Sequence, residues 1–402
     1  MVTYPEDWKK QPLGKIVDIF QGGTPKTGVA SYWGGKIVWL TPGEITKIKG
    51  MYVDNSERKI TEQGLNNSSA CLLPEGAILL CTRATIGDLA IAKVPLTTNQ
   101  GFKNLVCHSD IDNVFLQYLL RTKKEEMIER AIGTTFLEIS KKELSKIIIN
   151  FPEFQEQRAI AEALNSFDTY IDDLAELIEK KRGIRDGALE DLIVGRTRIA
   201  DYCGERKEYT ISDITRTVIT GGTPSTARQE YYGGNIPWLS STEIHQKRIK
   251  KPTTYITDLG LQSSSAKMAP ERSVLIALAG QGKTRGTAAY LTRPMALNQS
   301  LAALVTNGKC NPEFLYYLIE SMYLSLRELS SGDGGRGGLN KKLIKGVTVT
   351  VPVDVAEQEA IADTLTAMDE EIEALEIERD KMIQIREGAM DDLLTGRVRL
   401  SV

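Results

Sequence analysis

The chain has 402 residues, of which 41% are hydrophobic and 26% are charged, and its formal net charge is −3. This length and composition are typical of a soluble protein with two or three domains. Its apolar runs are shorter than the roughly 18 residues of a membrane helix, and its start lacks the apolar segment of a secretory signal. Five cysteines without a CxxC pair and only two histidines argue against a disulfide framework and a zinc site, so we expect a cytoplasmic protein with reduced thiols.

An internal repeat with a period near 200 residues organises the chain. Residues 22–45 and 221–244 both begin with GGTP, and 13 of their 24 aligned positions are identical. Further matches follow in the same order in both copies: LTTNQ with MALNQ, EQRAIAEAL with EQEAIADTL, and GALEDLIVGR with GAMDDLLTGR. This period is far longer than the roughly 20–50 residues of solenoid repeats. The chain is therefore predicted to contain two copies of one unit.

The first part of each copy mixes strand and helix signals. In the first copy, GAILLCT at 76–82 is typical of a buried strand, 113–131 have helical length and spacing, and IIINFP at 147–152 predicts a closing strand ended by proline. The same patterns recur in the second copy as SVLIALA, PEFLYYLIESMYLSLREL and VTVTVP. We therefore predict an α/β (α+β) globular domain at 1–152 and its duplicate at 201–352.

The second part of each copy is predicted to be a long helix, at 153–200 and at 353–402. Apolar side chains recur at alternating steps of four and three residues, which is the a/d seam of a coiled coil. The seam consists of Ile160, Leu164, Phe167, Ile171, Leu174 and Ile178 in the first copy, and of Ile361, Leu365, Met368, Ile372 and Leu375 in the second. Because the chain returns through a whole globular domain between the helices, we expect them to pair antiparallel. Ordinary core helices are the alternative.

Charge separates the two kinds of segment. Residues 156–196 and 357–397 carry net charges of −4 and −9, so the rest of the chain carries +10. Basic globular domains suit contact with phosphates, and acidic helices suit contact with protein partners. The alternative is that the charges serve solubility alone.

Polar loops of the predicted basic domains supply the candidate contacts to a nucleic acid. Thr24 and Thr223 of the GGTP loops either donate to phosphate or belong to tight turns between strands. Arginine and glutamine recognise guanine and adenine edges through paired hydrogen bonds, which makes Arg83 and its approximate counterparts the strongest candidates for base contacts. The basic cluster around Lys247 is either a phosphate contact or a solvated turn. The candidates are Thr24, Lys26, Arg83, Thr85, Thr134, Thr135, Lys141 and Lys142 in the first copy, and Thr223, Ser225, Lys247, Arg248, Gln281, Lys283, Arg285, Arg336, Asn340, Lys341 and Lys342 in the second.

Other repeated residues are expected to serve the scaffold. The tryptophan shared by the two GGTP segments is a predicted core residue. The Asn-Gln pairs at 99–100 and 298–299 have the right chemistry for adenine, but their identity in both copies favours a structural role. Arg185 and Arg386 fall on the extrapolated helix seam, where they either pair with acids across the coiled coil or extend to the surface.

The sequence shows no catalytic arrangement. ALAGQGKT at 277–284 is similar to a phosphate-binding loop, but a β-like segment follows it where such a loop needs a helix, and the first copy lacks the pattern. The sequence also lacks the glycine-rich strand and the aromatic-ended Pro-Pro loop of adenine methyltransferases, and a defensible Ser/His or Cys/His pair. We therefore expect no catalytic residue, cofactor or metal in this chain, and an NTPase is the least favoured alternative.

The tandem order of these motifs resembles the specificity subunit of type I restriction–modification enzymes over nearly the whole chain. In each copy a GGTP domain precedes an EQ..IA..L helix that ends in G-A-(L/M)-x-D-L-(I/L)-x-G-R. The resemblance implies two target recognition domains, each for one half of a split, asymmetric DNA target. It also implies that the helices form an antiparallel coiled coil, set the spacing of the half-targets and dock two methyltransferase subunits.

The same resemblance implies the chemistry of the complex. The methyltransferase subunits would methylate adenine N6, and restriction/translocase subunits would join them for cleavage. S-adenosylmethionine, ATP and magnesium would be bound by these partner subunits, in the cytoplasm of a bacterium or archaeon. A coiled-coil interaction scaffold without DNA specificity is the alternative function.

Overall fold

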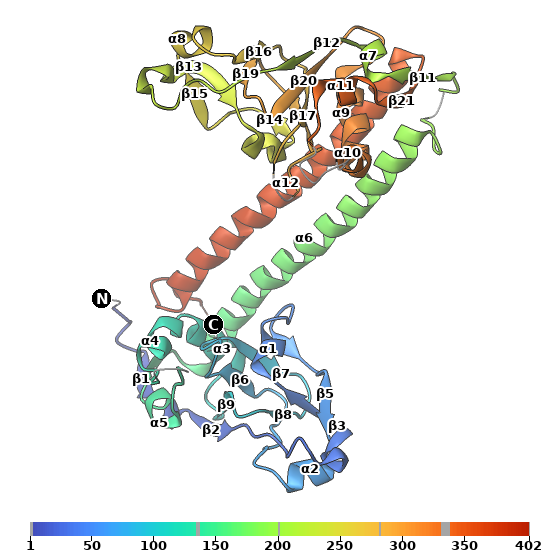
Figure 1. Cartoon of the computed structure of the whole chain (residues 1–402). Helices are drawn as coiled ribbons and strands as arrows, with labels where there is room; N and C mark the ends of the chain where they lie inside the picture. The colour runs from blue at the N-terminus through green and yellow to red at the C-terminus, as the bar shows by residue number, and fades with distance from the viewer. Residues whose placement is uncertain (1–2, 134–136, 200–201, 281–282, 331–337, 402) are drawn as a thin grey trace. The chain divides into compact units, whose positions relative to one another are not determined.

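The computed structural model describes residues 3–133, 137–199, 202–280, 283–330 and 338–401. Two compact units make up the chain, and each combines two stretches of sequence (Figure 1). Unit 1 comprises Met1–Leu177 with Leu375–Val402, and unit 2 comprises Ile178–Ala374. Each unit therefore contains one globular domain and one half of each of the two long helices.

A five-stranded mixed sheet in the order β2-β9-β6-β7-β4 forms the centre of the first globular domain. Neighbouring strands are antiparallel except for β4 and β7, which are parallel. The strand β6 is completely buried, as its continuous apolar run predicts. The five strands are β2 (Val17–Gln21), β4 (Tyr52–Val53), β6 (Ile78–Cys81), β7 (Leu89–Ala92) and β9 (Phe102–Cys107).

Smaller sheets and short helices complete this domain. The strands β5, β3 and β8 form a three-stranded sheet, and β1 pairs with the closing strand β10. Their bounds are β1 (Lys9–Pro12), β3 (Trp33–Leu40), β5 (Arg58–Ile60), β8 (Thr97–Thr98) and β10 (Ile148–Phe151). The helices are α1 (Pro42–Ile45), α2 (Glu62–Asn66), α3 (Asn113–Arg121), α4 (Lys124–Glu129) and α5 (Lys141–Leu144), with 3-10 turns η1 (Leu13–Lys15) and η2 (Ala30–Tyr32).

The segment 113–131, which has the spacing of one helix, forms the two helices α3 and α4. Asp112 caps the start of α3, where its side chain accepts the backbone N–H of Phe115 at 2.8 Å. At the end of α3, the Thr122 hydroxyl donates to the Leu119 carbonyl at 2.7 Å, and Lys123 leaves the helical conformation. A threonine that bonds its own backbone competes with helix continuation, and the apolar spacing alone does not reveal this.

The second globular domain repeats this arrangement in unit 2. A five-stranded sheet has the order β12-β20-β17-β18-β14, a four-stranded sheet has the order β15-β13-β19-β16, and β11 pairs with β21. The strands are β11 (Arg206–Thr210), β12 (Thr215–Thr220), β13 (Tyr232–Leu239), β14 (Arg248–Ile249), β15 (Thr254–Ile256), β16 (Lys267–Ala269), β17 (Val274–Ala277), β18 (Ala288–Leu291), β19 (Met295–Leu297), β20 (Leu301–Thr306) and β21 (Thr348–Pro352). The helices are α7 (Ile211–Ile214), α8 (Asp258–Gln262), α9 (Pro312–Ser321), α10 (Tyr323–Leu329) and α11 (Lys341–Lys345), with 3-10 turns η3 (Gln229–Tyr231) and η4 (Ser241–Gln246). The repeat in sequence is therefore a repeat in fold.

The long helices are α6 (Phe154–Val194), with 41 residues, and α12 (Val355–Leu393), with 39. At about 1.5 Å per residue, each is roughly 60 Å long. A glycine in the left-handed conformation follows each helix: Gly195 with φ 82° directly after α6, and Gly396 with φ 72° three residues after the end of α12. Glycine adopts this conformation without a steric penalty, which explains why the GR motif closes both helices.

Within each unit, the start of one long helix packs against the end of the other. In unit 1, Ile160 and Leu164 of α6 are buried in one core with Leu393 of α12 and side chains of the globular domain. In unit 2, Ile361 and Leu365 of α12 share a core with residues near the end of α6 in the same way. The helices are thus antiparallel, as predicted. The apolar stripe of each helix packs on its globular domain as well as on the other helix.

Charged side chains join the helices inside each unit. The side chain of Arg185 is 5% exposed, and its Nε donates to Asp369 of α12 at 2.9 Å while its Nη2 donates to Glu320 of α9. In unit 1, Arg386 of α12 donates from Nη1 to Asp168 of α6 at 2.8 Å. Both arginines therefore pair with acids across the helix pair.

Removal of the buried cation should destabilise the protein. In Arg185→Met, the carboxylates of Asp369 and Glu320 lose the guanidinium that neutralises them, and breaking a buried ion pair costs about 3 kcal/mol or more. We expect a loss of about this size in the free energy of unfolding, measured by urea titration followed by circular dichroism. Arg158→Met is the matched control, because Arg158 pairs with Glu162 at the exposed helix surface. Equal stabilities of the two variants would contradict this role of Arg185.

Candidate nucleic-acid interface

Strand register brings three loops of the first globular domain to one edge of its five-stranded sheet. Gln21, the last residue of β2, pairs with Lys103 near the start of β9, and Lys103 pairs with Leu80 near the end of β6. The GGTP loop follows β2, the Asn-Gln segment precedes β9, and the Arg83 loop follows β6. Segments far apart in the sequence therefore meet at this edge.

The GGTP loop is fastened to the Asn-Gln segment. The backbone N–H of Gly23 donates to the Thr98 carbonyl at 2.8 Å, and the Thr24 hydroxyl donates to Oε1 of Gln100. The second copy has the equivalent bond from Thr223 to Gln299 at 2.7 Å. Because these hydroxyl protons are donated to glutamine, a donation from them to phosphate would require an exchange of partners. The Asn-Gln segment has the structural role that its identity in both copies predicts.

The shared tryptophan and the loop glycines complete this fastening. Trp39 is 4% exposed and donates from Nε1 to the Gly23 carbonyl at 2.8 Å, and Trp238 donates to the Gly222 carbonyl at 3.1 Å. A Cβ at Gly22 would lie 1.9 Å from the Asn99 carbonyl oxygen, so a side chain has no room there. The exposed side chains of Lys26 and Ser225 follow the fastened loops.

Arg83 is held by an acid that the sequence analysis did not identify. Its Nε donates to Oε2 of Glu138 at 2.7 Å, and Lys103 donates from Nζ to Oε1 of the same carboxylate at 2.9 Å. Burial raises the pKa of Glu138, but the hydrogen bonds from Arg83 and Lys103 outweigh it and lower the pKa overall. Next to Arg83, Ala84 has a left-handed backbone with φ 57°, and Thr85 donates its N–H to the Arg83 carbonyl at 2.6 Å.

The loop before α5 brings further predicted residues to the same edge. The backbone N–H of Ile139 donates to the Thr82 carbonyl at 3.3 Å, and Nζ of Lys141 donates to the Ile19 carbonyl at 2.7 Å. Lys142 is exposed. The predicted contacts Thr134 and Thr135 lie outside the described residues.

The second copy places its predicted residues at the corresponding edge. Lys283 is exposed and its carbonyl accepts the Tyr323 hydroxyl at 2.9 Å, while Arg285 donates from Nη1 to the Ser330 hydroxyl at 3.5 Å. Lys341 and Lys342 are exposed at the start of α11. The predicted contacts Gln281 and Arg336 lie outside the described residues.

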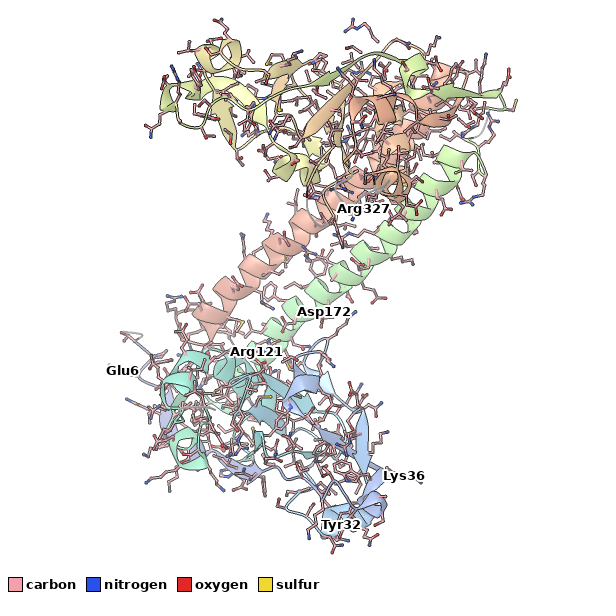
Figure 2. The ribbon with its side chains drawn as sticks, in the orientation of Figure 1. Glu6, Tyr32, Lys36, Arg121, Asp172 and Arg327 are labelled. Carbon is pink, nitrogen blue, oxygen red and sulfur yellow. The ribbon has the colours of Figure 1, made fainter. Side chains whose placement is uncertain are left out.

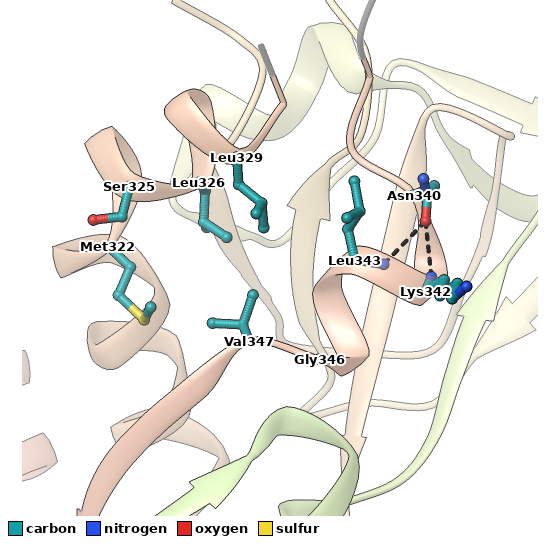
Figure 3. Close-up of a pocket in the computed structure, with 9 residues that line it drawn as sticks. All are labelled: Met322, Ser325, Leu326, Leu329, Asn340, Lys342, Leu343, Gly346 and Val347. Carbon is teal, nitrogen blue, oxygen red and sulfur yellow. Dashed lines mark hydrogen bonds between the residues drawn. The ribbon is translucent and has the colours of Figure 1, made fainter. Parts of the chain in front are cut away.

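Asn340 acts as a helix cap in this structure. Its Oδ1 accepts the backbone N–H groups of Lys342 and Leu343 at 2.9 and 3.0 Å (Figure 3). The adjacent pocket has a volume of about 520 Å³. Its lining is mostly apolar and consists of Met322, Ser325, Leu326, Leu329, Asn340, Lys342, Leu343, Gly346 and Val347. With one charged side chain, this pocket offers little for phosphate recognition.

The two residues of the basic cluster, Lys247 and Arg248, differ in their surroundings: Arg248 pairs with other side chains of the protein, and Lys247 is exposed. Arg248 donates from Nη2 to the Thr366 hydroxyl of α12 at 2.7 Å and lies 3.2 Å from Glu313 of α9. Burial lowers the pKa of Arg248, but its hydrogen bonds with Tyr317 and the nearby Glu313 charge raise it overall. The side chain of Lys247 is 58% exposed. Arg248 is therefore not part of a solvated turn, and DNA contacts by either residue stay predictions.

A polar pocket of about 440 Å³ lies at the helix junction of unit 1. Arg121, Asp168, Asp172 and Arg386 line it together with Lys49, and Figure 2 labels Arg121 and Asp172. Burial and the charges of Asp168 and its neighbours raise the pKa of Asp172. Carboxylates and cations nearly balance here, and Arg386 and Arg121 both pair with Asp168. The small net charge does not favour a highly charged ligand.

Features of the described residues bear on metal ions, membranes, reactive thiols and nucleotide binding. They contain no group of three His, Cys, Asp or Glu side chains that could hold a metal ion, and their helices include none long and apolar enough to cross a membrane. Burial raises the pKa of the Cys81, Cys107 and Cys310 thiols to about 12, which disfavours the reactive thiolate. The phosphate-loop-like segment that starts at Ala277 is followed by the strand β18, where nucleotide binding requires a helix.

A family model described as the type I restriction modification DNA specificity domain matches residues 5–181 and again 204–383. The chain belongs to this family. The MjaIX specificity subunit of a type I restriction enzyme from Methanocaldococcus jannaschii is 30% identical over 296 residues, which are 69% of this chain and 67% of that protein. The EcoR124I/EcoR124II specificity subunit from Escherichia coli is 30% identical over 46% of each chain.

Solved structures of specificity subunits share the fold. The S subunit of a type I restriction-modification system from M. genitalium has a TM-score of 0.62 at 19% identity, with 96% of each chain covered. The HsdS subunit from Thermoanaerobacter tengcongensis has a TM-score of 0.51 at 16% identity, with 98% of each chain covered. The fold of this chain is therefore similar to that of these specificity subunits over nearly the whole length of each chain.

The fastening of the GGTP loop should be sensitive to a single methyl group. In Gly22→Ala, the new Cβ would clash with the Asn99 carbonyl, so we expect a loss of about 1–3 kcal/mol in the free energy of unfolding. Gly28→Ala is the control, because a Cβ at Gly28 meets nothing within 4 Å. Urea titration compares the two variants. If the two variants had the same free energy of unfolding, the loop would not be held closely against the Asn-Gln segment.

Proposed function

We propose that this chain is the DNA-recognition subunit of a type I restriction–modification complex, and that each globular domain recognises one half of a bipartite target. The observation that carries the proposal is that basic and polar loops meet at one sheet edge in both copies of the globular domain. The family model that matches both copies is described as a DNA specificity domain. Lysine and arginine at such an edge suit phosphates, and arginine suits guanine.

The two copies differ where base recognition would occur, which supports an asymmetric target. The backbone N–H of Gly87 closes the first loop on the Cys81 carbonyl, and that of Gly286 closes the second on the Ala277 carbonyl. The second loop is three residues longer between the same structural positions. A different loop at the same edge would recognise a different base sequence, whereas a symmetric dimer is limited to two identical half-targets.

The long helices offer two equivalent surfaces for identical partners. Ile184 of α6 and Ile385 of α12 occupy matching positions in the two copies, and they are 52% and 42% exposed. Exposed apolar side chains that recur with their flanking motif mark a surface for protein contact. We assign these surfaces to two methyltransferase subunits that modify adenine N6, with restriction/translocase subunits added for cleavage.

This assignment places the chemistry outside the chain. S-adenosylmethionine, ATP and magnesium would be bound by the partner subunits, and the complex would work in the cytoplasm of a bacterium or archaeon. The test is co-expression with a partner methyltransferase, followed by methylome sequencing and binding to duplexes that carry the recovered motif. Loss of binding when either half is scrambled supports the proposal. Equal binding to all duplexes would instead favour an interaction scaffold without DNA specificity.

The purified chain alone should neither methylate nor cleave DNA. The expected result is no incorporation of labelled methyl groups from S-adenosylmethionine, and full incorporation once a methyltransferase subunit is added. Methylation by a preparation shown by mass spectrometry to be free of other subunits would contradict the proposal.

The helices should set the spacing of the two half-targets. Seven residues inserted after Leu177 and seven after Ala374, where the compact units divide α6 and α12, keep the antiparallel seam in register. One heptad adds about 10 Å, so the methylated motif should gain up to about three base pairs of spacer and keep both half-sequences. Methylome sequencing measures the motif.

Insertion in α6 alone is the control for this experiment. It shifts α6 against α12, so it should abolish methylation and should not produce a motif with a longer spacer. An active double-insertion variant with the original spacer would show that the helices do not determine the spacing.

A further inference from the structure

We infer that Glu138 is a positioning residue that fixes the Arg83 guanidinium for recognition of one guanine in the half-target of the first globular domain. This inference rests on the proposed function. It goes beyond it because it names the contact that specifies a base and the two side chains that hold this contact in place.

The geometry leaves the recognition end of the guanidinium outside the ion pair. Both Nε and Nη2 of Arg83 contact Oε2 of Glu138, at distances of 2.7 and 2.6 Å. A guanidinium has five N–H groups, and its Nη1 end carries donors that are separate from this edge. Paired donation to O6 and N7 of guanine can use that end, and the Arg83 side chain is 42% exposed.

Glu138 is itself held from inside the domain. Lys103 extends from β9, a central strand of the sheet, and its side chain is 3% exposed. Its ammonium donates to Oε1, the carboxylate oxygen that Arg83 does not use. The backbone of Glu138 is fixed by two hydrogen bonds with Ile132, at 3.0 and 3.2 Å. The carboxylate is therefore a rigid support between a buried cation and a surface cation.

Charge balance distinguishes this arrangement from a salt bridge needed for folding alone. The buried Lys103 ammonium requires one counter-charge, and Glu138 supplies it. Arg83 is not required for this neutralisation, so the cluster keeps one net positive charge at its exposed end. An electronegative partner such as the guanine edge would complete it.

The second copy has uncharged residues at the described positions that match Lys103 and Glu138. Strand pairing places Ala302 at the position of Lys103, since each pairs with the matching residues of the two neighbouring strands. The hydrogen bond from Leu339 to the Leu278 carbonyl matches that from Ile139 to Thr82, which places Gly338 at the position of Glu138. Scaffold features recur in both copies, so a feature confined to one copy fits target specificity.

The test compares full-length variants in complex with the partner methyltransferase. The probes are duplexes that carry the motif from methylome sequencing, with each base pair of both halves replaced in turn. Arg83→Ala should reduce discrimination at one G·C pair by about 5- to 150-fold. The variant Lys103→Met/Glu138→Ala leaves no buried charge unpaired and keeps Arg83 without its support. It should reduce discrimination at the same pair by about 2- to 10-fold, because ordering a free side chain costs binding energy.

A conservative variant and two opposite outcomes complete the experiment. Lys103→Met/Glu138→Gln retains an acceptor oxygen for Arg83, so it should recover part of the lost discrimination. Folded variants with unchanged discrimination at every position, or with an even loss at all positions, would overturn the role of Glu138. Absence of sequence preference in the wild-type complex would instead overturn the proposed function itself.

Discussion

The ion pairs between the two long helices are the interactions on which the rest of the structure depends. In unit 1, Asp168 of α6 accepts from Arg386 of α12 at 2.8 Å and from the Tyr118 hydroxyl of α3 at 2.7 Å. One carboxylate thus joins both long helices to the globular domain. Unit 2 contains the same triad, formed by Asp369, Arg185 and Tyr317. Because each triad lies where an apolar seam would otherwise continue, it fixes the axial register of the helices as well as their contact.

The two triads share their geometry but differ in their surrounding charge. Arg121 lies 3.7 Å from Asp168 in unit 1, and the matching position in unit 2 is Glu320, which pairs with Arg185. In unit 1, the cations Arg386 and Arg121 therefore both lie beside Asp168, whereas in unit 2 the carboxylates of Asp369 and Glu320 both pair with the buried Arg185. The helix residues of the triad stay constant while the neighbouring residue on the globular domain changes its sign. This separation allows the globular domains to diverge without loss of the helix register.

The fold was more predictable from sequence than the details of the interface. Repeat length, buried strands and heptads are local patterns, so the antiparallel helices and duplicated domains followed from them. The partners of Thr24 and Arg83 are 76 and 55 residues away in the sequence, and no local pattern indicates them. The residue type of Thr24 leaves phosphate contact and a tight turn as alternatives, and it does not indicate Gln100 as the acceptor. The break after Arg121 depends on a hydrogen bond of the Thr122 hydroxyl, which apolar periodicity does not reveal. Pairings between distant loops require the strand register, which the sequence did not provide.

Contacts that occur in both copies hold the loops in place, and contacts that occur in one copy fit the recognition of a particular target. The bond from the GGTP threonine to glutamine, the buried tryptophan and the crowded glycines occur in both copies, so they hold the loops against the sheet whatever the target is. In the second copy, Gly338 and Ala302 stand at the positions of Glu138 and Lys103, and the loop after β17 has a different length. A rigid edge common to both domains lets a change in a few loop residues alter the bases recognised while the fold persists. The hydrogen bonds that hold the GGTP loops are therefore the same in both domains, whereas the side chains that would contact bases, and the residues that position them, differ. This difference is the physical basis for the recognition of two different half-targets.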